Sequence, residues 1–152
     1  IQDMPNQIKN LWLKKFGKKI GISETKPKDY KLISNFLKGL ESRNEDFTLS
    51  FRKLTEDPEY FKSVDTDWFK NWKSRISDEL DPFAVMAKAN PNLIPRNHQI
   101  EIAIKAALNS DFNLFNRLNE ALKLPYKKTS EYTDLEATPT EEEEVLKTFC
   151  GT

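Results

Sequence analysis

Residues 90–108 read "NPNLIPRNHQIEIAIKAAL", and this stretch indicates the class of fold. Two prolines interrupt its first eight residues, because proline lacks the backbone N–H that the interior of a helix needs. Apolar side chains then recur every three or four positions, at Ile100, Ala103, Ile104, Ala107 and Leu108. That spacing places them on one face of a helix. We therefore expect a loop followed by a buried helix.

Apolar spacing of the same kind runs through most of the chain and predicts an all-α fold of about seven or eight helices. Glycine, which disfavours helix interiors, occurs only four times in 152 residues. The first predicted helix covers residues 5–16 and ends near Gly17. Its inward stripe comprises Ile8, Leu11, Trp12 and Lys15. The second covers about residues 30–41, and its buried stripe includes Ile33, Phe36 and Leu40.

Aspartates mark the starts of the helices that follow. A carboxylate at the N-cap accepts hydrogen bonds from the free backbone N–H groups of the first turn. Such positions lie at Asp46, at Asp57, at Asp65 or its neighbour Thr66, and at Asp81, and Ser110 or Asp111 opens the last long helix. After Asp65, aromatic residues repeat at helical spacing, and we expect Trp68, Phe69 and Trp72 in the core.

The last residues differ in character from the rest. Residues 126–139, "YKKTSEYTDLEATP", are polar and without period, which predicts an extended tail on the surface. Thr140 and Glu143 have the spacing of a capping box, which would open a short helix over residues 140–147. We therefore divide the chain into a helical domain, residues 1–125, and a tail, residues 126–152, that carries the sole cysteine, Cys150.

Composition excludes several classes of protein. Lys plus Arg and Asp plus Glu balance at 24 each, so no net field draws the chain to nucleic acid or to an anionic membrane. No apolar run approaches the roughly 20 residues that span a bilayer, and the first ten residues lack the features of a signal peptide. We expect a soluble, intracellular protein. Because the sequence begins at Ile1, we also expect its numbering to start inside a longer protein.

The chain shows no catalytic constellation. Its only histidine, His98, has no nucleophile-elbow sequence beside it, which argues against a serine-type triad. His98 and Glu101 could lie on one helix face as two metal ligands, but no second His or Cys completes a site. The scattered glycines form no phosphate-binding loop. We therefore expect no catalytic, cofactor-binding or metal-binding residue in this chain.

Several short motifs follow one another along the chain. The first, "DFTLSFRKL", covers residues 46–54. An Asn-Pro and Arg-Asn motif then precedes an alanine-rich helix, at Asn90, Pro91, Arg96 and Asn97. Ser110-Asp111 and Leu124-Pro125-Tyr126 follow it, and Cys150 lies third from the end. In this order the motifs resemble the C-terminal region of the selenoprotein O family, known in bacteria as YdiU. Animal members carry a further cysteine three residues before the last one, where this chain has Lys147.

The resemblance implies that the full-length protein is a kinase-like adenylyltransferase. Such a protein transfers AMP from ATP, with Mg²⁺ or Mn²⁺, to Ser, Thr or Tyr hydroxyls of protein substrates. The family's residues for ATP and metal binding precede this region. This chain would then be a non-catalytic, monomeric part that packs on the kinase-like core and supports it. The compartment would be the cytoplasm in a bacterium or the mitochondrion in a eukaryote.

The resemblance also implies roles for individual residues. Cys150, on an exposed tail, would form a disulfide with a cysteine of the core and make activity depend on redox state; otherwise it is an incidental terminal thiol. Arg96 and Asn97 would hold a helix start and a neighbouring loop.

The alternative function is a free-standing helical interaction module, in which Trp68, Phe69 and Trp72 face a protein partner. A domain severed from a larger core would expose an apolar patch, whereas an isolated module would not.

Overall fold

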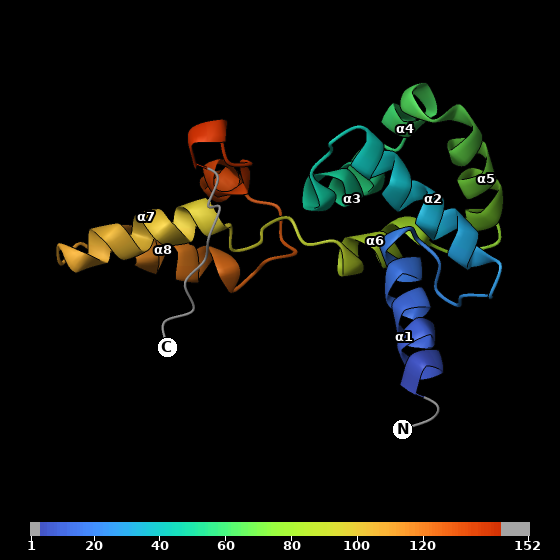
Figure 1. Cartoon of the computed structure of the whole chain (residues 1–152), viewed down its shortest axis with the longest axis horizontal. Helices are drawn as coiled ribbons and strands as arrows, with labels where there is room; N and C mark the ends of the chain where they lie inside the picture. The colour runs from blue at the N-terminus through green and yellow to red at the C-terminus, as the bar shows by residue number, and fades with distance from the viewer. Residues whose placement is uncertain (1–3, 144–152) are drawn as a thin grey trace. The chain divides into compact units, whose positions relative to one another are not determined.

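The computed structural model describes residues 4–143, which contain helices and no strand (Figure 1). The predicted all-α class is confirmed. None of the described helices has both the length and the apolar character needed to cross a bilayer. The elements are α1 (Met4–Lys19), α2 (Asp29–Ser42), α3 (Phe47–Glu56), α4 (Glu59–Val64), α5 (Thr66–Ile76), α6 (Pro82–Ala89), α7 (Asn97–Leu108), α8 (Asn113–Leu122) and two 3₁₀ helices, η1 (Ser130–Glu136) and η2 (Glu141–Glu143).

The chain divides into two compact units, Ile1–Pro91 and Asn92–Thr152. The boundary therefore lies at Pro91, whereas the sequence suggests one at residue 125. The reason is that the expected tail is not separate from the helices before it. Leu135 and Tyr132 pack with α7 and α8 in one apolar cluster.

Aromatic side chains from several helices form the core of the first unit. Phe36 of α2 contacts Phe51, Phe61 and Trp68, with ring centroids 5.1, 5.2 and 4.5 Å away. Trp68, Phe69 and Trp72 of α5 are all at least 96% buried, so their predicted place in the core is confirmed. The interaction-module alternative requires these three side chains to face a protein partner, and that part of it is therefore wrong.

The end of α1 and the face that it turns inward both differ from the prediction. This helix runs through Gly17 to Lys19, its buried residues are Leu13 and Gly17, and the buried Ile20 follows directly after it. Two members of the predicted inward stripe, Ile8 and Leu11, are 61% and 57% exposed. Gly17 lies within α1 and does not end it, and a side chain at this position would collide with the Thr25 methyl group. Two stripes fit the same helical period, and only packing selects between them.

Three of the four predicted aspartate caps are confirmed. Asp46, Asp65 and Asp81 each accept a hydrogen bond from the backbone N–H three residues ahead, at 2.8, 3.1 and 2.9 Å. Asp57 is different, because it ends α3 by donating its backbone N–H to the Lys53 carbonyl at 2.7 Å. The N-cap residue of α4 is Pro58.

In the second unit, α7 and α8 pack through Ala103, Leu118 and Ala121. The turn between them contains Ser110 with a positive φ of 63°, and the Asp111 carboxylate accepts from the Asn113 N–H at 3.0 Å. The expectation that α7 is a buried helix is wrong for most of its apolar residues. Ala103 is 4% exposed, but the residues Ile104 and Leu108 are 50% and 82% exposed.

The predicted extended tail is also wrong in part. Residues 130–136 form η1, whose Leu135 side chain is only 2% exposed. An ion pair from α8 holds this segment: the two Asp134 carboxylate oxygens accept from Arg117 at 2.6 and 2.7 Å. Half of the predicted capping box forms, because Glu143 accepts from the Thr140 N–H at 2.9 Å. The rest of the expected helix over residues 140–147, and Cys150, lie outside the described residues.

Candidate functional site

Asn90, the first residue of the family motif, joins three segments of the first unit. Its side chain is 4% exposed, and its amide donates to the backbone carbonyls of Lys19 at 2.9 Å and Phe51 at 3.3 Å. The amide also donates to the Thr55 hydroxyl at 3.0 Å. These bonds tie the ends of α1 and α6 to α3. Asn90 therefore occupies a buried position at which three segments of the unit meet.

Lys19 lies beside Asn90. Its ammonium group donates to the Ala89 carbonyl at 3.1 Å and lies 5.1 Å from the centre of the Phe51 ring. Burial lowers the pKa of Lys19. The lysine thus serves as a cation–π and hydrogen-bond contact at the C-terminal end of α6, where positive charge is favourable.

The second half of the motif lies in the other unit. Arg96 is 8% exposed, and its carbonyl accepts from the Gln99 and Ile100 N–H groups in the first turn of α7. Asn97 is the first residue of α7 and is exposed. Asn90 and Pro91 therefore belong to one unit, and Arg96 and Asn97 to the next.

The loop after Pro91 is tied down within the second unit. The Asn92 and Leu93 N–H groups both donate to the Pro125 carbonyl, at 2.7 and 3.1 Å, and the Asn92 amide donates to the Tyr126 carbonyl at 2.8 Å. The Leu-Pro-Tyr motif after α8 and the Asn-Pro motif before α7 thus meet in space. Sequence order alone does not predict this contact.

Charged groups in the first unit form two paired clusters. In one, Asp29 is 2% exposed and accepts from Arg75 at 2.9 and 3.2 Å, while Arg75 also donates to Glu79 at 3.0 Å. The hydrogen bonds that Arg75 donates to Asp29 raise the pKa of Arg75. Burial alone would raise the pKa of Glu79, but hydrogen bonds from Ser23 and Arg75 outweigh it and lower that pKa. The pKa of Arg75 moves further above neutral pH and the pKa of Glu79 moves further below it, so both groups stay charged at neutral pH.

The other cluster joins Glu45 to Arg43 and Tyr60. The Glu45 carboxylate accepts from Arg43 at 2.9 Å and from the Tyr60 hydroxyl at 2.8 Å. Burial would raise the pKa of Glu45, but these hydrogen bonds outweigh it and lower it, and the bond to Glu45 raises the pKa of Tyr60. Neither group is suited to exchange protons near neutral pH.

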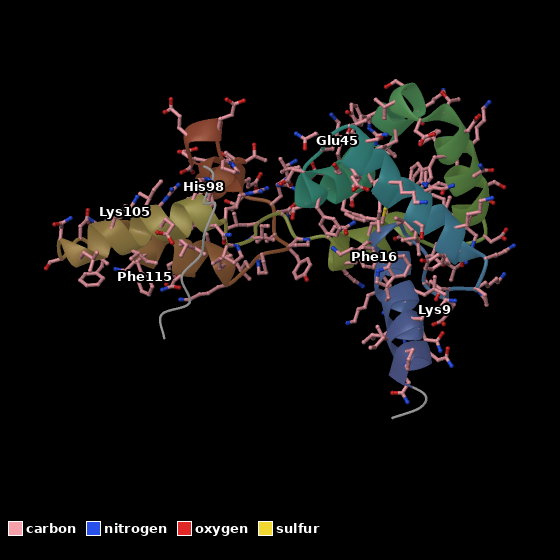
Figure 2. All side chains as sticks on the ribbon, viewed as in Figure 1. Lys9, Phe16, Glu45, His98, Lys105 and Phe115 are labelled. Atoms are coloured by element: carbon pink, nitrogen blue, oxygen red, sulfur yellow. The ribbon has the colours of Figure 1, made fainter. Side chains whose placement is uncertain are left out.

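Metal-ligating residues do not gather in the part of the chain that the structure describes. Between residues 4 and 143 no group of three or more His, Cys, Asp or Glu side chains lies close enough together to hold an ion. His98 is buried at the start of α7, at 7% exposure (Figure 2). The pKa of Glu143 is lowered by hydrogen bonds from Thr140.

The most distinctive surface feature is an apolar groove along α7 and α8, with a volume of ≈ 300 Å³. Four of the large side chains around it are about half exposed or more: Leu108 at 82%, Phe112 at 52%, Ile104 at 50% and Phe115 at 49%. Figure 2 marks Phe115 on α8 and, on α7, Lys105, which does not line the groove. The groove is lined by Ala103, Ile104, Ala107, Leu108, Phe112 and Phe115.

Sequence reasoning did not identify this groove, because it assigned the apolar residues of α7 to the core. One feature could have indicated it. Ile100, Ile102, Ala103 and Ile104 cover more than one side of the helix. A helix that is apolar on more than one side needs more than one partner to cover it.

These observations define the class of the molecule. In its described part it is an all-α protein with two clusters of paired charged groups in the first unit and an exposed apolar groove in the second.

No family model matches the sequence. Curated relatives, in contrast, match the chain from end to end. The protein nucleotidyltransferase YdiU of Ruegeria sp. (strain TM1040) is 41% identical over 160 residues, which cover 100% of this chain and 33% of the relative. The protein of the same name from Roseobacter denitrificans is 40% identical, with the same coverage. That of Bacillus cereus (strain ATCC 10987) is 35% identical over 96% of this chain and 32% of the relative.

The chain therefore belongs to the YdiU family, as the motifs indicate. It spans about one third of the length of these relatives, consistent with the C-terminal region that the motifs resemble.

Proposed function

We propose that this chain is the C-terminal, non-catalytic part of a protein adenylyltransferase, which transfers AMP from ATP to Ser, Thr or Tyr residues of protein substrates. One observation carries the proposal. Relatives named protein nucleotidyltransferase match the whole chain, yet the chain spans only 33% of the length of the Ruegeria and Roseobacter proteins. ATP and Mg²⁺ or Mn²⁺ would bind in the remaining two thirds.

The described residues support a non-catalytic role. The carboxylates of the buried clusters already accept hydrogen bonds from arginines, and their lowered pKa values keep them charged. Such groups hold together the segments that they join, whereas a general acid or base needs a pKa close to the working pH. The role of this part would be to support a kinase-like core.

The exposed groove on α7 and α8 favours this proposal over a free-standing interaction module. Soluble monomers rarely expose a large contiguous apolar patch, because covering it stabilises the protein. A part of a larger protein can expose such a patch when it is described by itself.

The proposal includes a regulatory role for Cys150. Its thiol would form a disulfide with a cysteine of the catalytic core. Two thiols would lose two protons and two electrons to an oxidant of the disulfide class, such as oxidised glutathione, and a reductant would reverse the step. Because the bond would join the tail to the core, activity would then follow the redox state.

Mass spectrometry of the full-length polypeptide tests both ideas. The protein is incubated with ATP and Mg²⁺ or Mn²⁺, with and without reductant, and the wild type is compared with Cys150→Ser. Added AMP that responds to reductant only when Cys150 is present supports the transferase and the redox role. AMP addition indifferent to Cys150 removes the redox role alone, and no AMP addition under any condition contradicts the transferase.

A binding measurement on the 152-residue chain gives the complementary test. We expect no ATP binding at micromolar concentration, because the described residues contain no glycine-rich phosphate loop. Micromolar affinity for ATP would contradict the non-catalytic assignment.

A further inference from the structure

We propose that the groove between α7 and α8 is the docking site for an uncharged, apolar surface from the other two thirds of the same polypeptide. The inference deepens the proposed function, and it rests on that proposal in one respect, that this chain is part of a longer protein. It adds which face of the chain makes the contact and what chemistry that face accepts.

The large apolar side chains around the groove are exposed in this chain, as expected of a surface that a partner covers. Leu108 is 82% exposed at the C-terminal end of α7, and Phe112 and Phe115, at 52% and 49%, follow at the start of α8. Covering such side chains releases free energy in proportion to the apolar area, about 25 cal/mol per Å². Within the described residues of this unit, the buried cluster around Leu118 shares only Ala103 with the groove lining, so the cluster does not cover the large side chains of the groove.

The lining selects the kind of partner. All six side chains around the groove are aliphatic or aromatic, and none carries a charge or a hydrogen-bonding group. Small-molecule sites normally add a few polar groups that orient the ligand. A charged partner would lose its hydration here without gaining a hydrogen bond. The lining therefore fits apolar side chains that project from another protein surface.

The geometry of the groove is set in advance. The turn that joins α7 to α8 is held by hydrogen bonds from the Ser110 and Asp111 N–H groups to the carbonyls of Ala107 and Ala106, at 2.9 and 3.0 Å. The positive φ of Ser110 reverses the chain there. Phe112 and Leu108 are thereby placed on either side of one short turn. A preorganised apolar surface binds its partner without the cost of ordering a loop.

The length of the relatives identifies the occupant. Relatives at 40% and 41% identity match this chain from end to end, and each continues for about two thirds of its own length beyond the matched part. A covalently linked partner is present at a high effective concentration, so a groove of only ≈ 300 Å³ can be filled stably. A second copy of the chain would lack that advantage.

Cysteine labelling of the full-length polypeptide tests this inference. Leu108→Cys places a thiol in the groove, and Lys105→Cys places one on an exposed position of the same helix that does not line it. Both are made in a Cys150→Ser background. Because Leu108 is 82% exposed in this chain, its replacement removes little packing within the unit. Rates of modification by a maleimide are followed by mass spectrometry of the peptide that contains each position, in the folded protein and in urea.

We expect position 108 to react about ten-fold or more slowly than position 105 in the folded protein, since a cover that is open a tenth of the time slows labelling ten-fold. In urea the two positions should react alike. Equal rates in the folded protein would overturn the inference. Protection that disappears on dilution would also overturn it, because it would indicate a second copy.

The labelling result is independent of the proposed activity. Protection at position 108 in a protein that transfers no AMP would support the docking site and contradict the transferase. Full reactivity in a protein that does transfer AMP would contradict the docking site alone.

Discussion

Replacing Asn90 by alanine should destabilise the first unit by about 2–3 kcal/mol. The substitution removes an amide that is 4% exposed and that donates to the Lys19 and Phe51 carbonyls and to the Thr55 hydroxyl. The magnitude depends on which of these acceptors finds another donor. The Phe51 carbonyl keeps the Thr55 hydroxyl as a donor at 2.8 Å.

The Lys19 carbonyl, at the end of α1, loses the side-chain donor that reaches it. A buried acceptor left without a partner costs about 1–3 kcal/mol, and each lost net hydrogen bond about 1 kcal/mol. The upper part of that range applies because Asn90 also accepts a weaker bond from the Lys19 ammonium group, at 3.4 Å. A value of about 2–3 kcal/mol follows.

The assay is urea unfolding followed by tryptophan fluorescence. All three tryptophans, Trp12, Trp68 and Trp72, lie in the first unit, so the fluorescence reports on that unit alone. The matched control is Asn71→Ala, which removes an exposed amide from α5 and should change the free energy of unfolding by less than about 0.5 kcal/mol. If Asn90→Ala changes it no more than the control does, the hydrogen bonds of Asn90 do not hold the unit together.

Three further predictions concern the same unit. Arg75→Ala should cost about 3–5 kcal/mol in the same assay, because it leaves Asp29 buried and unpaired, and adding Asp29→Asn should recover part of that loss. Gly21→Ala should lower the free energy of unfolding by about 1–3 kcal/mol, since Gly21 has a φ of +86°; an unchanged thermal midpoint would contradict this. The hydrogen bond from Arg43 helps to lower the pKa of Glu45. The stabilisation that the charged Glu45 carboxylate gives is therefore present above its ordinary pKa of about 4.3 and is lost as the pH falls through the lowered value. The stability difference between wild type and Glu45→Gln should therefore shrink from about pH 7 to about pH 3, and a constant difference would show that Glu45 does not titrate as described.

Asp46 and Asp57 both have the sequence pattern of an N-cap, but only Asp46 caps a helix with its side chain. Asp46 precedes a run of helix-forming residues and caps it, as predicted. Asp57 precedes Pro58, a pattern that also opens helices, yet it closes α3 instead. Both residues follow local rules of hydrogen bonding, but a helix end and a helix start only a few residues apart compete for the same position.

The candidate site was predictable only in part. The residues of the family motif could be found from the sequence, but the three acceptors that the Asn90 amide reaches could not. The groove could not, because helical spacing shows that Ile104 and Leu108 share a face with Ala103, while Ala103 alone is buried. Whether such a face meets another helix depends on where the next helix packs.

The sequence by itself determined the helices, three of the aspartate caps and the aromatic core around Trp68 and Trp72, because these depend on neighbours within one or two turns and on apolar surface too large to leave in water. The tertiary structure alone decided which stripe of α1 faces inward, that η1 joins α7 and α8 in one unit, and that the groove lining is exposed in this chain. The physical reason is that periodicity shows which side chains share a face of a helix, whereas burial depends on what packs against that face.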